Sequence, residues 1–413
     1  MILMEKTKGI SRQLITAGWT SFFSEIGSST FMFSVSLLLL HTYHNAGVFT
    51  LVQLLEPGII LLFNPFIGVY VDQHKKKNIA LTSQLGLVIT FVILSAWINK
   101  AIKSPLFLVY LTICLFIILI STQSRKVSYQ AAVISMMPRG SVNKMVSVQQ
   151  TCTLSATLIA PFIGSLLYST LCFKSSVFFE GVTEIIVLLG IFLIKFELYA
   201  TGNHTFQGTQ KNILSQLASG LTIIKVHRNL LLVVLLSSFI NFFFAAINIG
   251  LPITVIESKN MGSFSLAVIE VGLSIGMLSG GITSGFMKSV NITVIGFRLA
   301  IIGILVVAMG VFFLSNVLII ILIGITTLCF FVGLLIVRIN IPMSSYVKES
   351  VPLDYQGRVN STVDALSSLM SPFGIITFGF LFAHTWNPTI YLLSGLFILF
   401  ISIGFSHKIS KGD

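Results

Sequence analysis

Long apolar runs are the feature that most limits how this chain can fold. An α-helix needs about 20 mostly apolar residues to cross the hydrocarbon core of a bilayer, and the chain contains twelve runs of this kind. Only 9% of its residues are charged, whereas soluble domains carry about 25%. The sequence therefore predicts an all-α membrane protein. The predicted spans are residues 17–40, 47–71, 79–98, 105–124, 147–171, 176–194, 229–253, 263–286, 293–315, 317–337, 361–384 and 389–407.

The basic residues predict how these helices are oriented. Lys and Arg are enriched in cytoplasmic loops. With a cytoplasmic amino terminus, four of the 25 basic residues lie outside, namely Lys100, Lys103, Lys174 and Lys259. We therefore expect both termini in the cytoplasm and the protein in a plasma membrane. The net charge of +12 is explained by these loops, and no nucleic acid is expected as a partner because no soluble basic module is present.

The longest polar interruption, residues 195–228, divides the chain near its middle. A constant shift of 217 residues places Ser21 on Ser238 and Gly68 on Gly285, and such internal repeats are typical of secondary transporters. We therefore expect two six-helix bundles, residues 1–194 and 229–413, joined by a cytoplasmic loop at 195–228. Residues 211–225 of this loop have the pattern of a short amphipathic helix on the membrane surface.

One short segment after the second run links the chain to a known family. It reads Gly-Val-Tyr-Val-Asp-Gln-His-Lys-Lys-Lys from residue 68 to residue 77. It resembles the loop signature Gly-x-x-x-Asp-Arg-x-Gly-Arg-Lys of the major facilitator superfamily, although Gln73 and Lys75 depart from it. The alternative is a plain basic anchor at a helix end. The matching residues are Gly68, Asp72, Lys76 and Lys77.

Two further segments resemble parts of this family that export drugs and siderophores. The run Ala160-Pro161-Phe-Ile-Gly164 resembles the antiporter signature of drug exporters, with small residues replacing some of its glycines. The run Gln356-Gly357-Arg358-Val359 resembles the macrolide-efflux and enterobactin-exporter branch. The resemblance implies that Pro161 and Gly164 belong to a sliding interface between the bundles, and that Arg358 clamps helix ends. Ordinary helix packing and contact with lipid headgroups are the alternatives.

The first predicted helix carries a polar stripe, because Ser21, Ser24, Glu25 and Ser28 lie on one helical face. A charged carboxyl facing lipid costs about 2.5–3.5 kcal/mol, so this face should line a water-filled cavity. The resemblance implies that the first, fourth, seventh and tenth helices line it. Hydrogen bonds between helices, worth about 0.6 kcal/mol each, are the alternative. The candidate substrate residues are Ser21, Ser24, Ser28, Gln123, Asn241, Asn248 and Thr326.

Several acids lie in or beside the apolar runs, and no Lys or Arg lies in the middle of a predicted span. A buried carboxyl without a cation avoids desolvation by taking up a proton, as a proton-driven carrier requires. Glu56 precedes Pro57, where a broken backbone hydrogen bond admits water. Glu180 and Glu184 are one turn apart near an outer helix end, where water can also solvate them. The candidate proton-coupling residues are Glu25, Glu56, Glu184 and Glu270, and permanently neutral structural acids are the alternative.

We interpret the chain as a proton-driven exporter of a small amphipathic organic molecule, either a siderophore, which the resemblance slightly favours, or a drug such as a macrolide. It needs no cofactor beyond the proton gradient, is not an enzyme and is expected to be a monomer. The four scattered cysteines have no metal-ligand spacing. An ATP-driven pump would need a phosphate-binding Gly-x-x-x-x-Gly-Lys loop, which the sequence lacks. An importer of the same fold is the strongest alternative.

Overall fold

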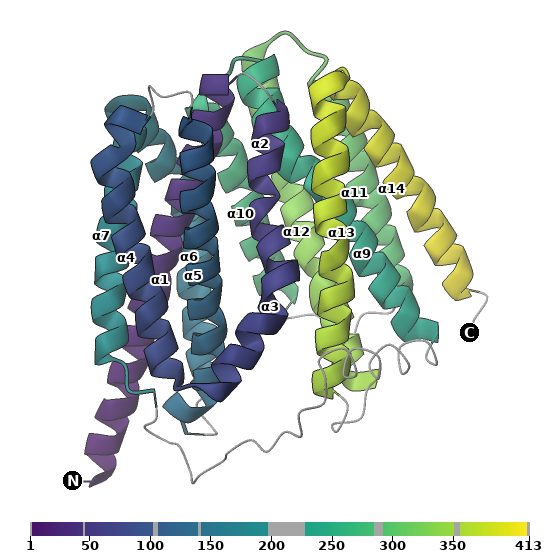
Figure 1. Cartoon of the computed structure of the whole chain (residues 1–413). Coiled ribbons are helices and arrows are strands. Elements are labelled where there is room, and N and C mark those ends of the chain that lie inside the picture. Colours follow the sequence, from purple (N-terminus) through teal and green to yellow (C-terminus); the bar gives the residue numbers. More distant parts are fainter. Residues whose placement is uncertain are drawn as a thin grey trace. The chain divides into compact units, whose positions relative to one another are not determined.

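The computed structural model describes residues 2–43, 46–101, 106–138, 142–196, 228–284, 292–350 and 356–410, and these residues form helices and short turns without strands (Figure 1). The predicted surface helix at 211–225 lies outside them. The helices are α1 (Ile2–Tyr43), α2 (Ala46–Gln53), α3 (Leu55–Gln73), α4 (Lys76–Ala101), α5 (Phe107–Met136), α6 (Val142–Leu171), α7 (Phe173–Leu193), α9 (Arg228–Pro252), the π-helix η2 (Ile253–Ser258), α10 (Ser263–Ser284), α11 (Ile292–Phe312), α12 (Leu318–Ser350), α13 (Gln356–His384) and α14 (Asn387–Ser410).

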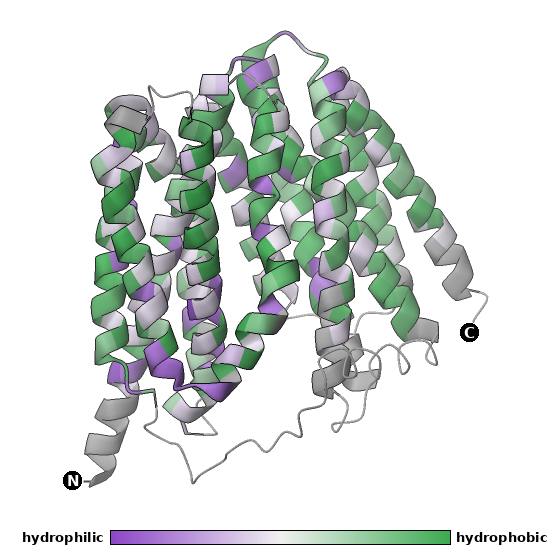
Figure 2. Ribbon diagram, in the orientation of Figure 1, coloured by the Kyte–Doolittle hydropathy of each residue, from purple (hydrophilic) through white to green (hydrophobic). Residues whose placement is uncertain are grey.

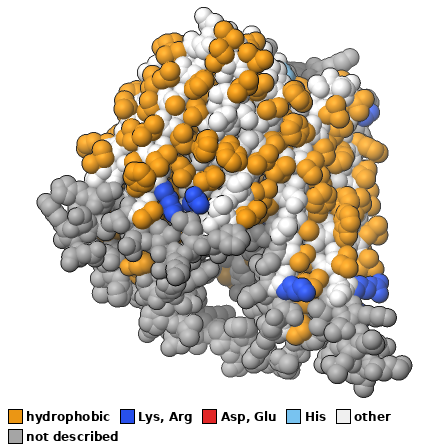
Figure 3. Space-filling model, turned by 180° about the vertical axis from the view of Figure 1, so that it is seen from behind, with side chains coloured by type: hydrophobic (Ala, Val, Ile, Leu, Met, Phe, Trp, Pro, Cys, Tyr) orange, Lys and Arg blue, Asp and Glu red, His pale blue; other side chains and the backbone are white. Residues whose placement is uncertain are grey.

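The helices of the described residues confirm the predicted membrane architecture. Twelve of them, counting α2 with α3 and α9 with η2, are long and apolar enough to cross a membrane. Figure 2 shows apolar residues along most of their length. Large side chains such as Phe66 and Phe400 are more than 70% exposed, and hydrophobic side chains cover the described helices on the face seen in Figure 3. Such surfaces fit a hydrocarbon surrounding, in which the helix satisfies its own backbone.

The contacts within the chain divide it into two compact units. The first unit comprises Met1–Leu38 and Gly58–Gln210, and the second comprises Leu39–Pro57 and Lys211–Asp413. Residues 39–57 belong to the second unit because α2 packs on α13, where a Cβ added to Gly379 would overlap the side chain of Thr50. The expected boundaries at residues 194 and 228 adjoin residues 197–227, which lie outside the described part, and they stay a prediction.

The second predicted span is interrupted rather than continuous. Helix α2 ends at Gln53 and α3 begins at Leu55. Pro57 explains the break, because proline has no N–H to donate to the carbonyl of Gln53 and its ring crowds that carbonyl. The break places Glu56 in the first turn of α3, where its side chain is exposed. The positive, N-terminal end of the α3 helix dipole therefore lies beside this carboxyl and favours its negative charge.

Glycines let α10 and α12 approach until their backbones touch. A Cβ added to Gly272 would lie 2.7 Å from Thr326 Cγ2, and one added to Gly280 would lie 2.5 Å from the carbonyl oxygen of Leu334. A Cβ at Gly276 would overlap the carbonyl of Phe330. The four-residue spacing places these glycines on one face of α10, and small residues at helix contacts are what allows such close packing.

We predict that Gly276→Val prevents α10 from packing on α12. Overpacking a filled contact typically costs about 1–3 kcal/mol, and here the obstacle is backbone, which cannot rotate away. The yield of monodisperse full-length protein in detergent and its thermal unfolding midpoint should both fall. Gly281→Val is the matched control on the same helix, because its Cβ would meet nothing nearer than Val337 Cγ1 at 4.0 Å. Equal losses of yield and unfolding midpoint in the two variants would contradict the predicted role of Gly276 in the contact between α10 and α12.

Candidate functional site

The first unit contains a cavity of about 680 Å³, formed by α1, α5, α6 and α7. Pockets that bind small molecules typically measure about 300–1,000 Å³, so this space suits an organic molecule of moderate size. Most of the lining side chains are polar or charged. The lining residues are Thr20, Ser21, Ser24, Glu25, Arg125, Lys126, Tyr129, Gln130, Val133, Gln149, Thr153, Val187 and Ile191.

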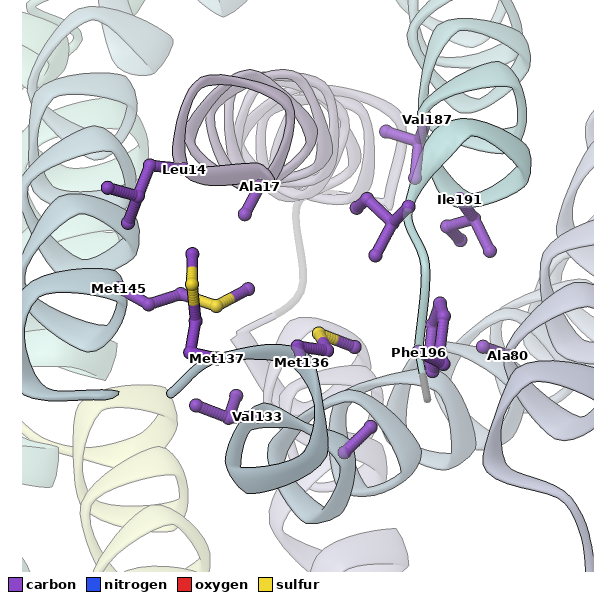
Figure 4. Packing of buried hydrophobic residues seen from close by; sticks show 12 residues of the cluster. Leu14, Ala17, Ala80, Val133, Met136, Met137, Met145, Val187, Ile191 and Phe196 are labelled. Atoms are coloured by element: carbon purple, nitrogen blue, oxygen red, sulfur yellow. The ribbon is translucent and has the colours of Figure 1, made fainter. Parts of the chain in front are cut away.

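One side of this cavity borders a buried hydrophobic cluster. Val133, Val187 and Ile191 belong to both the cavity wall and the cluster. Figure 4 shows Met137 and Met145 lying next to each other in the cluster. Methionine side chains are flexible and adapt to irregular shapes. The cavity therefore offers a polar wall and an adaptable apolar side, an arrangement that suits an amphipathic molecule.

The polar stripe of α1 reaches the cavity as predicted for three of its four residues. Ser21, Ser24 and Glu25 line it, whereas Ser28 is half-buried outside the lining. One carboxylate oxygen of Glu25, Oε1, accepts a hydrogen bond of 2.9 Å from Ser29 Oγ, one turn further along. This bond holds the carboxyl in place on the helix while the cavity remains open to it.

A buried ion pair joins Arg125 in the cavity wall to Glu184 behind it. Arg125 Nη1 contacts Glu184 Oε2 at 2.8 Å, and the side chains of the two residues are 5% and 2% exposed. Nη1 also donates to Gln84 Oε1 at 2.6 Å, and Nη2 donates to Ser24 Oγ at 2.6 Å. Gln84 Nε2 donates both to the Glu184 carboxylate and to the Glu184 carbonyl, the latter at 2.8 Å. One guanidinium thus ties α1, α4, α5 and α7 together.

This ion pair corrects two expectations from the sequence. Arg125 was placed in a cytoplasmic loop, but α5 continues to Met136 and its apolar span to Val133. The expectation that these acids lack a cation is therefore wrong for Glu184. A basic residue ends a span only when its charge is uncompensated, and here Glu184 compensates it. The sequence signal for this ion pair was the presence of Glu184 inside the predicted span 176–194 and of Arg125 one residue beyond the predicted span 105–124.

A second carboxyl is buried one turn from Glu184. Glu180 is 2% exposed, so the alternative that water solvates it at a helix end is wrong. Its Oε2 accepts a hydrogen bond of 3.0 Å from Thr183 Oγ1. Helix α1 closes over it at Gly27, because a Cβ there would overlap both the Glu180 carboxyl and the Thr183 hydroxyl. Glycine at this position is required by the close approach of α1 to α7.

A family model of the Major Facilitator Superfamily matches residues 17–375, which is most of the chain. The protein belongs to this superfamily. It is a membrane transport protein, and its substrate is a small molecule. The family resemblance inferred from the loop signature is confirmed, together with the twelve-helix fold.

The similar proteins and solved structures cover between 76% and 97% of the chain. Macrolide efflux protein A of Streptococcus pyogenes is 22% identical over 409 residues, covering 97% of this chain and 96% of its own. The protein of that name from Enterococcus faecalis is 22% identical over 328 residues, 76% of this chain and 94% of its own. A bacterial homologue of the iron transporter ferroportin, inward-facing, has a TM-score of 0.73 at 12% identity, covering 96% of this chain and 98% of its own. The xylose transporter XylE from E. coli, inward open, has a TM-score of 0.65 at 15% identity, covering 96% and 95%.

The other candidate substrate residues of this major facilitator protein have local partners. Gln123 Nε2 donates to Asn64 Oδ1 at 2.7 Å and lies outside the cavity lining. Asn241 Nδ2 donates to the Ser237 carbonyl of its own helix at 3.1 Å. Asn248 is exposed, and Thr326 packs on Gly272. The bond to Asn64 agrees with the alternative of hydrogen bonds between helices for Gln123. The Thr326 hydroxyl is buried without a hydrogen-bond partner among the described residues. The predicted substrate contacts of all four residues remain predictions.

The four candidate proton-coupling acids fall into different units. Glu25 and Glu184 lie in the first unit, on the cavity wall and behind it. Glu56 and Glu270 lie in the second unit, where Glu56 is exposed and Glu270 is half-buried on α10. Among the described side chains, Arg125 and Glu184 form the one ion pair found. The first unit therefore contains the cavity, the ion pair and two of the four candidate acids.

Two lysines of the major facilitator loop signature contact neighbouring helices of the first unit. Lys77 Nζ donates to the carbonyls of Phe192 and Ile194 at 3.3 and 3.4 Å, at the end of α7 where carbonyls lack helical partners. The backbone carbonyl of Lys76 accepts from Ser128 Oγ at 2.5 Å. A Cβ added to Gly68 would meet no described atom within 4 Å. The side chains of Asp72 and Arg358, and the surroundings of Gly357, lie outside the described part.

Two proline-containing helices pack closely on another helix of their own unit. On α6, which contains Pro161, a Cβ added to Gly164 would lie 2.9 Å from Phe33 Cδ1 of α1. On α13, a Cβ added to Gly374 would lie 2.5 Å from the Phe242 carbonyl of α9. The segment that resembles the antiporter signature thus supplies helix packing within the first unit, and its role at a sliding interface stays a prediction.

Proposed function

We propose that this protein is a proton-driven exporter of amphipathic, macrolide-like molecules. The observation that carries the proposal is the first-unit cavity, in which the Glu25 carboxyl lies in the wall together with Arg125, itself paired with Glu184. A carboxyl that changes charge beside a buried ion pair alters the field in which the substrate binds. The adjoining hydrophobic cluster accepts the apolar part of the substrate. The names of the macrolide-efflux relatives support this substrate class over a siderophore.

The proposed cycle uses alternating access with opposite movements of proton and substrate. Both termini lie in the cytoplasm of a bacterium, as the basic residues indicate. When the cavity opens outward, Glu25 takes a proton and the substrate leaves. When it opens inward, Glu25 releases the proton and a new substrate enters. A membrane potential of 100 mV supplies about 2.3 kcal/mol per charge that crosses, which drives the substrate outward.

Transport in reconstituted vesicles tests this proposal. We expect full-length protein in proteoliposomes to move a radiolabelled macrolide against its gradient when a proton gradient is imposed, and not when an ionophore collapses it. Expression in a susceptible host should lower cellular accumulation of the drug. A catecholate siderophore serves as the second substrate arm. Higher accumulation in expressing cells would indicate an importer, and transport that ignores the proton gradient would contradict proton coupling.

A further inference from the structure

Two buried carboxyls and one guanidinium share the core of the first unit. Glu180 and Glu184 occupy successive turns of α7 and are 2% and 1% exposed. Among the described residues, Glu184 and Arg125 are the charged groups that act on Glu180. With both carboxyls ionised, this buried group would carry a net negative charge. A buried charge without a partner is strongly unfavourable, so such a group binds a proton instead.

The hydrogen bonds indicate which carboxyl remains ionised. Glu184 accepts from Arg125 and from Gln84, and donors of this kind stabilise a carboxylate. Glu180 accepts one bond from the Thr183 hydroxyl. We propose that Glu180 and Glu184 form a second proton-binding site of the transporter, which holds one proton on Glu180 while Glu184 neutralises Arg125. The presence of this proton is inferred from the contacts alone, whereas its role in transport rests on the proposed function.

The surroundings of the site restrict how it communicates with the cavity. On α1, Gly27 covers Glu180 and Glu25 lies in the cavity wall. On α4, the neutral Gln84 faces Glu184, and on α5 the ionisable groups are Arg125, Lys126 and Tyr129. Glu180 and Glu184 are absent from the cavity lining, whereas Arg125 and Ser24 belong to it. Arg125 is therefore the residue that links the buried pair to the cavity.

This link makes the charge of the pair depend on Arg125. If Glu184 became neutral, the buried guanidinium would lack a counter-ion, and Glu180 would have to ionise to supply one. The two carboxyls of the pair therefore share one proton, and they bind one proton fewer when either of them is replaced by glutamine. An ordinary buried neutral acid would show no such dependence on its neighbour.

Infrared spectroscopy of the purified full-length protein in lipid nanodiscs tests the inference without requiring transport. A protonated carboxyl gives a C=O stretch that shifts in D2O, and at neutral pH we expect Glu180→Gln to remove one such band. Glu184→Gln should remove the same band, because Glu180 then ionises to neutralise Arg125. The double variant Arg125→Gln/Glu184→Gln should restore it. Glu25→Gln is the control and should leave the band in place.

Each result decides between the alternatives. An unchanged spectrum in Glu180→Gln would mean that Glu180 is ionised, which overturns the proton site. Loss of the band in Glu180→Gln but not in Glu184→Gln would overturn its dependence on Arg125. If Glu184→Gln does not fold, the double variant and Glu180→Gln still give the answer, since both preserve the charge balance. Failure of vesicle transport would count against the proposed function and would leave this spectroscopic result intact.

Discussion

Arg125→Leu is expected to destabilise the protein by about 3–5 kcal/mol and to abolish transport, because removing one partner leaves the other buried and uncompensated. Glu184 is 1% exposed and would lose its only ion pair among the described residues. The substitution also removes the hydrogen bonds of Arg125 to Gln84 and Ser24, which join α5 to α4 and α1. Thermal unfolding of the detergent-solubilised protein measures the loss of stability.

A double-mutant cycle separates the charge effect from the packing effect. Arg125→Leu/Glu184→Leu removes both charges, and replacing a buried pair by apolar residues is often neutral or stabilising. The double variant should therefore recover most of the stability that Arg125→Leu loses. Lys126→Leu is the adjacent control, since Lys126 is exposed and its removal should change stability little. A double variant as unstable as Arg125→Leu would show that the two side chains stabilise the fold through packing rather than through their charges.

The transmembrane architecture follows from the sequence because the bilayer imposes one length and one composition on every span. The helical period was equally informative on α1, where it places Ser21, Ser24 and Glu25 on the cavity wall. Both the twelve spans and the polar stripe of α1 depend only on the composition and period of a single helix. Neither result required knowing which helices are neighbours.

The ion pair was missed because its partners are distant in sequence. Arg125 lies 41 residues from Gln84 and 59 from Glu184, and only the packing of α4, α5 and α7 brings them together. Taken alone, Arg125 followed by Lys126 has the pattern of a loop. The same limit applies to Gly68, because residue type shows that a close approach is possible but not which helix makes it. At Gly27 and Gly164, the neighbouring helix is present and the approach is realised.

Glu25→Gln is expected to abolish uphill export while preserving downhill movement of the substrate. Glutamine retains the size of the side chain and an oxygen that can accept the bond from Ser29 Oγ, now 2.9 Å long, so the fold should not change. It fixes the neutral state, so no proton is released into the cytoplasm during the cycle. One charge crossing 100 mV supplies about 2.3 kcal/mol, equivalent to roughly a fifty-fold substrate gradient. This whole gradient should disappear.

Two measurements on the same vesicles distinguish loss of coupling from loss of binding. Glu25→Gln vesicles should not concentrate a macrolide when a proton gradient is imposed, yet they should exchange labelled for unlabelled macrolide across the membrane. Glu270→Gln is the comparison variant, because it neutralises the candidate acid of the second unit, outside the cavity lining, and we expect it to leave uphill export in place. If Glu25→Gln vesicles still concentrate the drug, Glu25 is a structural acid. The proton must then bind elsewhere, and the buried pair of Glu180 and Glu184, which Arg125 joins to the cavity wall, is the site placed to hold it.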